Sequence, residues 1–295
     1  MESDNPLSQA ITAHQQGKLD EAERLYREIL KIEPKHPATN HNLGILINSL
    51  NKTTDALELF KIAAEENPNI EQYWISYFTA LIKEKKLDVA EVVCKKALEF
   101  NPDSAEAYNS LGIIFNKFLK LDEAEGSFKK AIALKKNSIE FYNNLAATQH
   151  MLHKSNDAIS NYKKSIELKP DHAVTYYNQG ITFFDLGKQV ESEISYRKAI
   201  KLKPDYAEAY NNLASSLYIS GKLDEALIMY NKAISLKPNF KIAIQSRGHV
   251  LFDKKNFNDS LRDFDICNTE ESRARSLASL YALGRIDEIY KRIED

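Results

Sequence analysis

Cysteine, glycine and proline are all scarce in this chain. Of its 295 residues only two are cysteines, Cys94 and Cys267, and their separation suggests neither a metal site nor a disulfide framework. We therefore expect two buried thiols in a reducing compartment. The 9 glycines and 8 prolines are too few for a turn-rich β fold, so the composition favours long helices.

The chain also lacks a strong excess of charge and any long apolar run. Its formal net charge is −2, whereas nucleic-acid-binding domains are usually basic, so we expect no nucleic-acid partner. No stretch reaches the about 20 apolar residues that a membrane helix needs. The polar start MESDNPLSQA does not have the pattern of a signal peptide. These absences predict a cytoplasmic protein that does not associate with membranes.

Motifs for catalysis and cofactor binding are missing as well. The segments DLGKQV and ALGRID are typical of turns between helices rather than of phosphate loops, and no G-x-S-x-G motif occurs. His150 and His153 could supply half of a metal site, but no third ligand accompanies them. We therefore predict that the chain is not an enzyme and holds no metal and no cofactor.

What the sequence does contain is an internal repeat of 34 residues. Prolines mark it at intervals of 34 residues or twice that: Pro34, Pro68, Pro102, Pro170, Pro204 and Pro238. With this proline at position 32, eight units begin at residues 3, 37, 71, 105, 139, 173, 207 and 241. Position 20 is then small in every unit, position 8 is small except at Phe78, and position 24 is aromatic except at Cys94. Agreement among so many columns excludes chance.

Each unit has the pattern of two amphipathic helices. Positions 4, 7, 8 and 11 form an apolar stripe at helical spacing, which the seventh unit fills with Tyr210, Leu213, Ala214 and Leu217. A glycine turn and a second helix follow, and we expect the proline to end that helix because its ring cannot continue the helical hydrogen bonds. A single hairpin cannot bury its apolar faces, so stacked hairpins are expected to form an all-α solenoid.

These columns closely resemble the tetratricopeptide repeat, over nearly the whole chain. The seventh unit matches it most fully, through Tyr210, Leu213, Ala214, Ala226, Tyr230, Ala233 and Pro238. The resemblance implies a right-handed superhelical solenoid of antiparallel helix pairs, with the array spanning residues 3–269. In residues 270–295, YALGRIDEIY restarts the turn pattern about five residues early, so we expect a degenerate terminal hairpin there.

Position 6 of the first helix is polar and uncharged in every unit. At about 100° per residue, positions 2, 6, 9 and 13 lie opposite the apolar stripe. Position 6 is filled by Ser8, Asn42, Ser76, Ser110, Asn144, Asn178, Asn212 and Ser246. An amide offers donors and an acceptor, so it can bind a peptide backbone without selecting a side chain. Alternatively, these side chains brace the neighbouring repeat, and the two roles are compatible.

The resemblance implies that the first helices line a concave groove. The array is similar to those of bacterial tetratricopeptide proteins and of O-linked N-acetylglucosamine transferase, in which an asparagine ladder grips an extended peptide. We expect Asn109, Asn143 and Asn211, at position 5, to contact the adjoining helix instead. Aromatic residues at positions 5 and 12 are either binding positions or packing between repeats; they are Tyr177, Phe184, Tyr218 and Phe252.

Charges on the same face indicate the nature of the partner. Positions 2 and 13 carry six carboxylates and two ammonium groups, a net charge of −4: Asp4, Glu106, Glu140, Asp185, Glu208 and Asp253 against Lys83 and Lys117. Positions 2, 5, 6 and 9 of the eight units hold no lysine or arginine. A chaperone ligand held through a carboxylate clamp is therefore disfavoured, and a neutral to basic peptide or partner helix is expected.

The preferred function is a non-catalytic module that binds another protein. One alternative is that the chain is the N-terminal targeting array of a larger enzyme. Similar arrays precede glycosyltransferase, sulfotransferase or oxygenase domains in bacterial proteins. A third interpretation is a scaffold that associates with itself through exposed terminal repeats. The sequence identifies neither the partner nor the oligomeric state.

Overall fold

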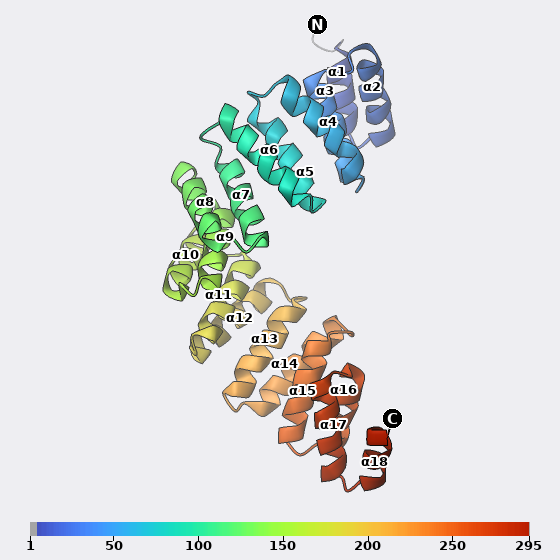
Figure 1. The fold of residues 1–295 in the computed structure, drawn as a ribbon, viewed down its shortest axis with the longest axis vertical. Coiled ribbons are helices and arrows are strands. Elements are labelled where there is room, and N and C mark those ends of the chain that lie inside the picture. Colours follow the sequence, from blue (N-terminus) through green and yellow to red (C-terminus); the bar gives the residue numbers. More distant parts are fainter. Residues whose placement is uncertain (1–4, 295) are drawn as a thin grey trace. The chain divides into compact units, whose positions relative to one another are not determined.

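A computed structural model describes residues 5–294 as eighteen α-helices, and no strand occurs among them (Figure 1). Residue 3, Asp4 and Asp295, which belong to the predicted array and its last hairpin, lie outside these residues. The chain divides into two compact units, residues 1–152 and 153–295. Helices adjacent in the chain pack against each other within each unit, so the prediction of an all-α solenoid of helix pairs is confirmed.

The first unit contains nine helices within the described residues. Its first helices are α1 (Pro6–Gln15), α3 (Pro37–Ser49), α5 (Glu71–Lys83), α7 (Ala105–Lys117) and α9 (Ile139–Met151). Its second helices are α2 (Leu19–Ile32), α4 (Thr53–Glu66), α6 (Leu87–Phe100) and α8 (Leu121–Leu134). From α3 onward each first helix begins at the first residue of a 34-residue repeat.

The second unit begins with the second helix of the fifth repeat. Its helices are α10 (Ser155–Leu168), α11 (Ala173–Asp185), α12 (Gln189–Leu202), α13 (Ala207–Ile219), α14 (Leu223–Leu236), α15 (Lys241–Asp253), α16 (Phe257–Cys267), α17 (Glu270–Ala282) and α18 (Ile286–Glu294). No helix among residues 5–294 combines the length and the apolarity needed to cross a membrane.

The apolar stripe of the first helices is buried largely as predicted. In α13, Leu213, Ala214 and Leu217 are at most 1% exposed, whereas Tyr210 is only half-buried. The side chain at position 4 also forms a hydrogen bond. In three repeats it donates to the backbone carbonyl of the preceding repeat's proline. These bonds are Asn40 to Pro34 (2.9 Å), Trp74 to Pro68 (2.8 Å) and Tyr176 to Pro170 (3.2 Å). In these three repeats position 4 therefore fastens the first helix to the turn before it.

Proline proves unnecessary for ending the second helix. In the fourth repeat, where Lys136 replaces the proline, α8 still ends at Leu134, the position at which α2 ends at Ile32. The proline is therefore not required to end the helix in this repeat, and its role in the repeats that contain it stays a prediction.

The turn inside every hairpin contains a residue in the left-handed region. It stands at position 15, where φ lies between 58° and 75°, and glycine fills it in only some repeats: Gly17, Asn51, Lys85, Leu119, His153, Gly187, Gly221, Lys255 and Gly284. A helix commonly ends on such a residue because this conformation redirects the chain. The non-glycine residues in the column adopt it at a cost in conformational energy.

Replacing Leu119 with glycine is expected to raise the free energy of unfolding by about 0.5–1 kcal/mol. Leu119 has φ 58° and its side chain is 74% exposed, so the substitution relieves strain and removes little packing. Urea unfolding followed by circular dichroism measures the change. Ala133→Gly, at an exposed site in the last turn of α8, is the control and is expected to lose up to about 1 kcal/mol. Equal losses in the two variants would contradict the assignment of strain.

Close contact within most hairpins depends on a small residue at position 8. A Cβ atom added to Gly112 would lie 2.6 Å from the Phe128 ring, and one added to Gly44 would lie 2.7 Å from Phe60. The third repeat reverses these sizes. Its position 8 is Phe78 and its position 24 is Cys94, and both are buried, 1% and 0% exposed. The large side chain has moved from the second helix to the first.

The last hairpin is joined to the array by a shortened second helix. Helix α16 ends at Cys267, Asn268 adopts the left-handed conformation, and Thr269 caps α17. Arg292 of α18 then donates to Asp265 at 2.6 and 2.9 Å, and this pairing lowers the pKa of the Asp265 carboxyl. Since Gly284 occupies the turn, a ninth repeat begins at Glu270 rather than at 275.

Candidate interaction surface

The first helices expose the face that the sequence placed opposite the apolar stripe. We call positions 2, 6, 9 and 13 of these helices the first-helix face. Its position-13 side chains are exposed: Lys83, Lys117, Asp185 and Asp253. Six of the seven candidate residues at position 6 are half-buried asparagines or serines, among them Asn42, Ser76, Asn144, Asn178 and Asn212. Ser246 is half-buried too, whereas Ser110 is only 7% exposed and has little surface to offer.

Position 6 makes hydrogen bonds between neighbouring repeats. At three junctions its side chain reaches position 5 of the preceding first helix, 35 residues earlier. The bonds join Ser76 Oγ to His41 Nε2 (2.9 Å), Asn144 Nδ2 to Asn109 Oδ1 (2.9 Å) and Asn212 Nδ2 to Tyr177 Oη (3.2 Å). The bracing role therefore exists in the structure. The sequence signal that could have revealed it is the coincidence of polar residues at positions 5 and 6 of successive repeats.

Asn178 differs from the braced members of the column. Its backbone carbonyl accepts a bond from Thr182 at 3.1 Å, but its side-chain amide makes no hydrogen bond within residues 153–294 of the second unit. By contrast, Asn42 interacts with the His41 ring, and Ser246 with the Tyr230 phenol. The half-buried amide on α11 thus keeps both its donors and its acceptor for another molecule.

Two of the position-5 asparagines, Asn109 and Asn211, form hydrogen bonds to other side chains of the array. Asn109 is 5% exposed, donates to Glu140 Oε1 at 3.0 Å and accepts from Asn144. It therefore contacts the adjoining first helix, as expected. Asn211 is 7% exposed and donates to Asn212 Oδ1 at 3.0 Å, which fixes the orientation of that position-6 amide.

Of the aromatic candidates, Tyr177 belongs to the packing between repeats. Its ring lies 4.8 Å from that of Tyr206 and 6.1 Å from that of Tyr196, and its hydroxyl accepts from Asn212. Burial raises the pKa of the Tyr177 phenol. Tyr177 is half-buried and helps to position Asn212.

The position-12 aromatics are half-buried and form a column in the second unit. Phe184 lies on α11, Tyr218 on α13 and Phe252 on α15. Tyr218 donates to Asp253 at 2.5 Å, and this bond raises the pKa of the phenol to about 12. The ninth repeat continues the column with Tyr281, which is 73% exposed. Sequence reasoning missed Tyr281 because the last repeat starts five residues early.

The first-helix face is less acidic than its carboxylates suggested. Glu106 pairs with Lys135 at 2.6 Å, and Glu208 with Lys237 at 3.0 Å, because the lysine at position 31 folds back onto position 2. The hydrogen bond from Lys237 holds the pKa of Glu208 below its usual value. The ninth repeat also places Arg275 at position 6, a column without cations in the other eight. Asp4 lies outside the described residues.

Groups suited to metal binding or nucleophilic chemistry do not gather on this face. Within residues 5–294 no cluster of three or more histidine, cysteine or acidic side chains is arranged to hold a metal ion. Cys94 and Cys267 are buried free thiols, as predicted, and burial raises the pKa of both. The arrangement offers hydrogen bonds and apolar contact.

Comparison with protein families assigns the repeats. Models of the tetratricopeptide repeat match residues 13–77, 93–126, 127–160 and 207–240, and a further TPR repeat model matches residues 182–218. The match at 207–240 coincides with the seventh unit of the frame set by the prolines. No curated protein matches the sequence.

Solved structures share the architecture. YrrB, described as a TPR protein with an unusual peptide-binding site, is 22% identical with a TM-score of 0.53, and the match covers 64% of this chain and 97% of YrrB. MamA is 26% identical with a TM-score of 0.50, covering 54% and 92%. A chain of the APC/C hetero-tetramer Cut9–Hcn1 is 15% identical with a TM-score of 0.67, covering 95% and 56%. The first and third of these likenesses concern the fold alone.

Proposed function

The chain belongs to the tetratricopeptide repeat family, and we propose that its first-helix face binds an extended, neutral to basic segment of another protein. Repeats of this family are generally non-catalytic scaffolds for protein interaction. The observation that carries the finer proposal is the side-chain amide of Asn178, half-buried on α11 with no partner inside residues 153–294 of its own unit.

Neighbouring groups suit this amide to a peptide backbone. Asn212, at the same position on the adjacent first helix α13, is held by Asn211 and Tyr177, so its orientation is set before a partner arrives. Such preorganisation lowers the entropy lost on binding. The half-buried rings of Phe184 and Tyr218 lie on the same two helices and offer apolar contact to the partner's side chains. Recognition of this kind depends on an extended backbone more than on a particular side chain.

Asn178→Ala is expected to weaken peptide binding about 3–10-fold, the effect of losing one hydrogen bond. The probes are short peptides selected from a displayed random library on the intact chain, with affinities measured by fluorescence anisotropy. Stability should change by no more than about 0.5 kcal/mol, since the side chain has no internal partner to lose. The matched control is Asn156→Ala with Asn258→Ala, two exposed asparagines on second helices.

Two results would count against the proposal. One is a set of selected peptides whose affinity is the same for Asn178→Ala, for the control and for the unaltered chain. The other is selection of predominantly acidic peptides, which would show that the remaining carboxylates of the face do not govern the choice of partner.

A further inference from the structure

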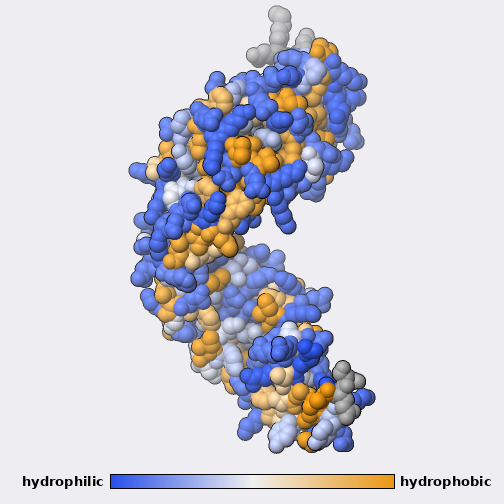
Figure 2. Space-filling model, viewed as in Figure 1, coloured by the Kyte–Doolittle hydropathy of each residue, from blue (hydrophilic) through white to orange (hydrophobic). Residues whose placement is uncertain are grey.

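Helix α18 presents an apolar stripe to solvent. Its apolar residues follow the helical spacing i, i+3, i+4, i+7, namely Ile286, Ile289, Tyr290 and Ile293. Ile286 is 40% exposed, Tyr290 is 64% exposed and Ile293 is 66% exposed. Hydrophobic side chains are visible at this end of the chain in Figure 2. An exposed apolar stripe of this kind is typical of a contact surface.

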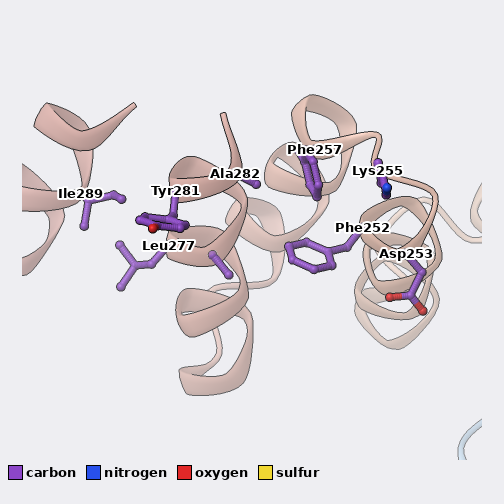
Figure 3. A pocket seen from close by; sticks show the side chains of 9 residues that line it. Phe252, Asp253, Lys255, Phe257, Leu277, Tyr281, Ala282 and Ile289 are labelled. Carbon is purple, nitrogen blue, oxygen red and sulfur yellow. The ribbon is translucent and has the colours of Figure 1, made fainter. Parts of the chain in front are cut away.

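The stripe is exposed because the two helices of the ninth hairpin, α17 and α18, pack loosely against each other. Position 8 of this repeat is Leu277 instead of a small residue. The corresponding position-24 side chain, Ile293, is 66% exposed, whereas Phe264 of the preceding repeat is fully buried. A cavity of about 700 Å³ adjoins the hairpin, lined by residues that include Phe252, Phe257, Leu277, Tyr281 and Ile289. Figure 3 shows Tyr281 and Leu277 on one side of it and the two phenylalanines on the other.

The charges along α18 are arranged so that two copies of the helix, packed antiparallel, place opposite charges next to each other. Asp287 lies one turn before Lys291, and neither forms an ion pair within the described chain, whereas Glu288 pairs with Arg285 and Arg292 with Asp265. When two copies of such a helix run in opposite directions, the acidic N-terminal half of each faces the basic C-terminal half of the other. A parallel arrangement would set like charges side by side.

We propose that α18 is a homodimerisation surface, on which the α18 helix of a second copy packs antiparallel about a two-fold axis near Ile289 and Tyr290. Ile286 of one copy then meets Ile293 of the other, and Asp287 meets Lys291 on each side of the axis. The interface is isologous, so each contact occurs twice. Exposed Tyr281 and the adjoining cavity lie beside it and accept apolar atoms of the second copy.

Sedimentation of the full chain over a range of concentrations tests the surface. We expect a monomer–dimer equilibrium, which is weak because a two-turn helix buries less area than a stable dimer usually does. Ile293→Asp should abolish the dimer. Ile194→Asp, at a site on α12 that is 63% exposed, is the matched control and should leave the dimer intact. Circular dichroism confirms that both variants remain helical.

Charge reversal gives a second readout that does not depend on the apolar residues. Asp287→Lys and Lys291→Asp should each weaken the dimer about tenfold, because each places two pairs of like charges across the axis. Mixing the two variants should restore association, since every pair then joins a lysine to an aspartate. A chain that stays monomeric at all concentrations would overturn the proposal. So would a dimer unaffected by Ile293→Asp, or a mixture that does not recover. None of these outcomes bears on peptide binding by Asn178.

Discussion

Phe78→Ala is expected to lower the free energy of unfolding by about 3–5 kcal/mol, because it removes a fully buried ring and leaves a cavity between α5 and α6. Phe78 is 1% exposed and belongs to the core of the first unit. Since stability in repeat arrays is a sum of local terms, the loss should concentrate in the third repeat and its neighbours. Urea unfolding measures the total, and hydrogen exchange of the α5 and α6 amides locates it.

A double-mutant cycle tests the reason for this cost. Cys94→Tyr alone should destabilise by about 1–3 kcal/mol, because a second ring must enter a space that Phe78 already fills. Combining it with Phe78→Ala recreates the arrangement of Ala214 and Tyr230 in the seventh repeat, where both residues are buried. Tyr230 contacts the Ser215 hydroxyl at 2.9 Å, and Thr79 stands at the equivalent position beside Cys94.

The combined variant should therefore recover about 0.5–3 kcal/mol relative to the sum of the single changes, the range found for residues in contact. Strictly additive losses would show that positions 8 and 24 do not share one space in this repeat. Gly248→Ala offers a comparison from the second unit, because its added Cβ would lie 2.9 Å from the Phe264 ring and should also destabilise.

The sequence was sufficient to locate the helix pairs. Spacing of the prolines and of the small residues at positions 8 and 20 set a frame, and each first helix from α3 to α15 begins at the residue this frame specifies. A pattern that recurs in every repeat remains reliable where the local sequence is ambiguous about secondary structure, as it is at an asparagine inside a helix. The frame also identified Phe78 and Cys94 as exceptions to the pattern, each in its own column. Only the packing shows that they belong together, because the large side chain at position 8 fills the space that the small one at position 24 leaves.

Residues in the left-handed backbone conformation could be predicted only where the residue is glycine. Gly17, Gly187 and Gly221 indicate the turn, whereas Leu119 and Lys85 adopt the same conformation without any local sequence signal. Tertiary packing imposes the turn on them, because both flanking helices are fixed by their neighbours. The same argument explains why α8 ends at the same repeat position as α2 although no proline follows it.

Partners of polar side chains were the least predictable part of the candidate site. The column of asparagines at position 6 was evident, but the bonds from Asn144 and Asn212 to position 5 depend on the offset between neighbouring first helices. That offset follows from packing and not from periodicity. For the same reason the lysines that neutralise Glu106 and Glu208 could not be assigned from the sequence.

Arg247 shows how a polar pair replaces an apolar contact within this frame. The residue stands at position 7, which is leucine in four of the eight repeats, and its guanidinium donates two bonds to Asp263 at 2.6 and 2.8 Å. Asp263 stands at position 23, the position that pairs with position 7 in the sixth repeat, where Ser195 donates to Gln179 at 3.2 Å. The arginine that departs from the repeat pattern is therefore matched by a second departure 16 residues later.

Arg247→Leu is expected to lower the free energy of unfolding by about 3–5 kcal/mol, because it leaves the Asp263 carboxylate buried without its partner. The Asp263 side chain is only 4% exposed, so water cannot replace the lost bonds. Asp263→Met should cost less, since the Arg247 side chain is 24% exposed and its guanidinium still donates to Asn231 at 2.6 Å.

The double variant, Arg247→Leu with Asp263→Met, reproduces Leu213 and Met229 of the seventh repeat. Replacing a buried ion pair by apolar residues of similar volume is often neutral or stabilising, so this variant should unfold near the urea midpoint of the unaltered chain. Hydrogen exchange in α15 and α16 locates the loss in the single variants. If Arg247→Leu were as stable as the double variant, the Asp263 carboxylate would have to reach water without the arginine, and the pair would have no structural role.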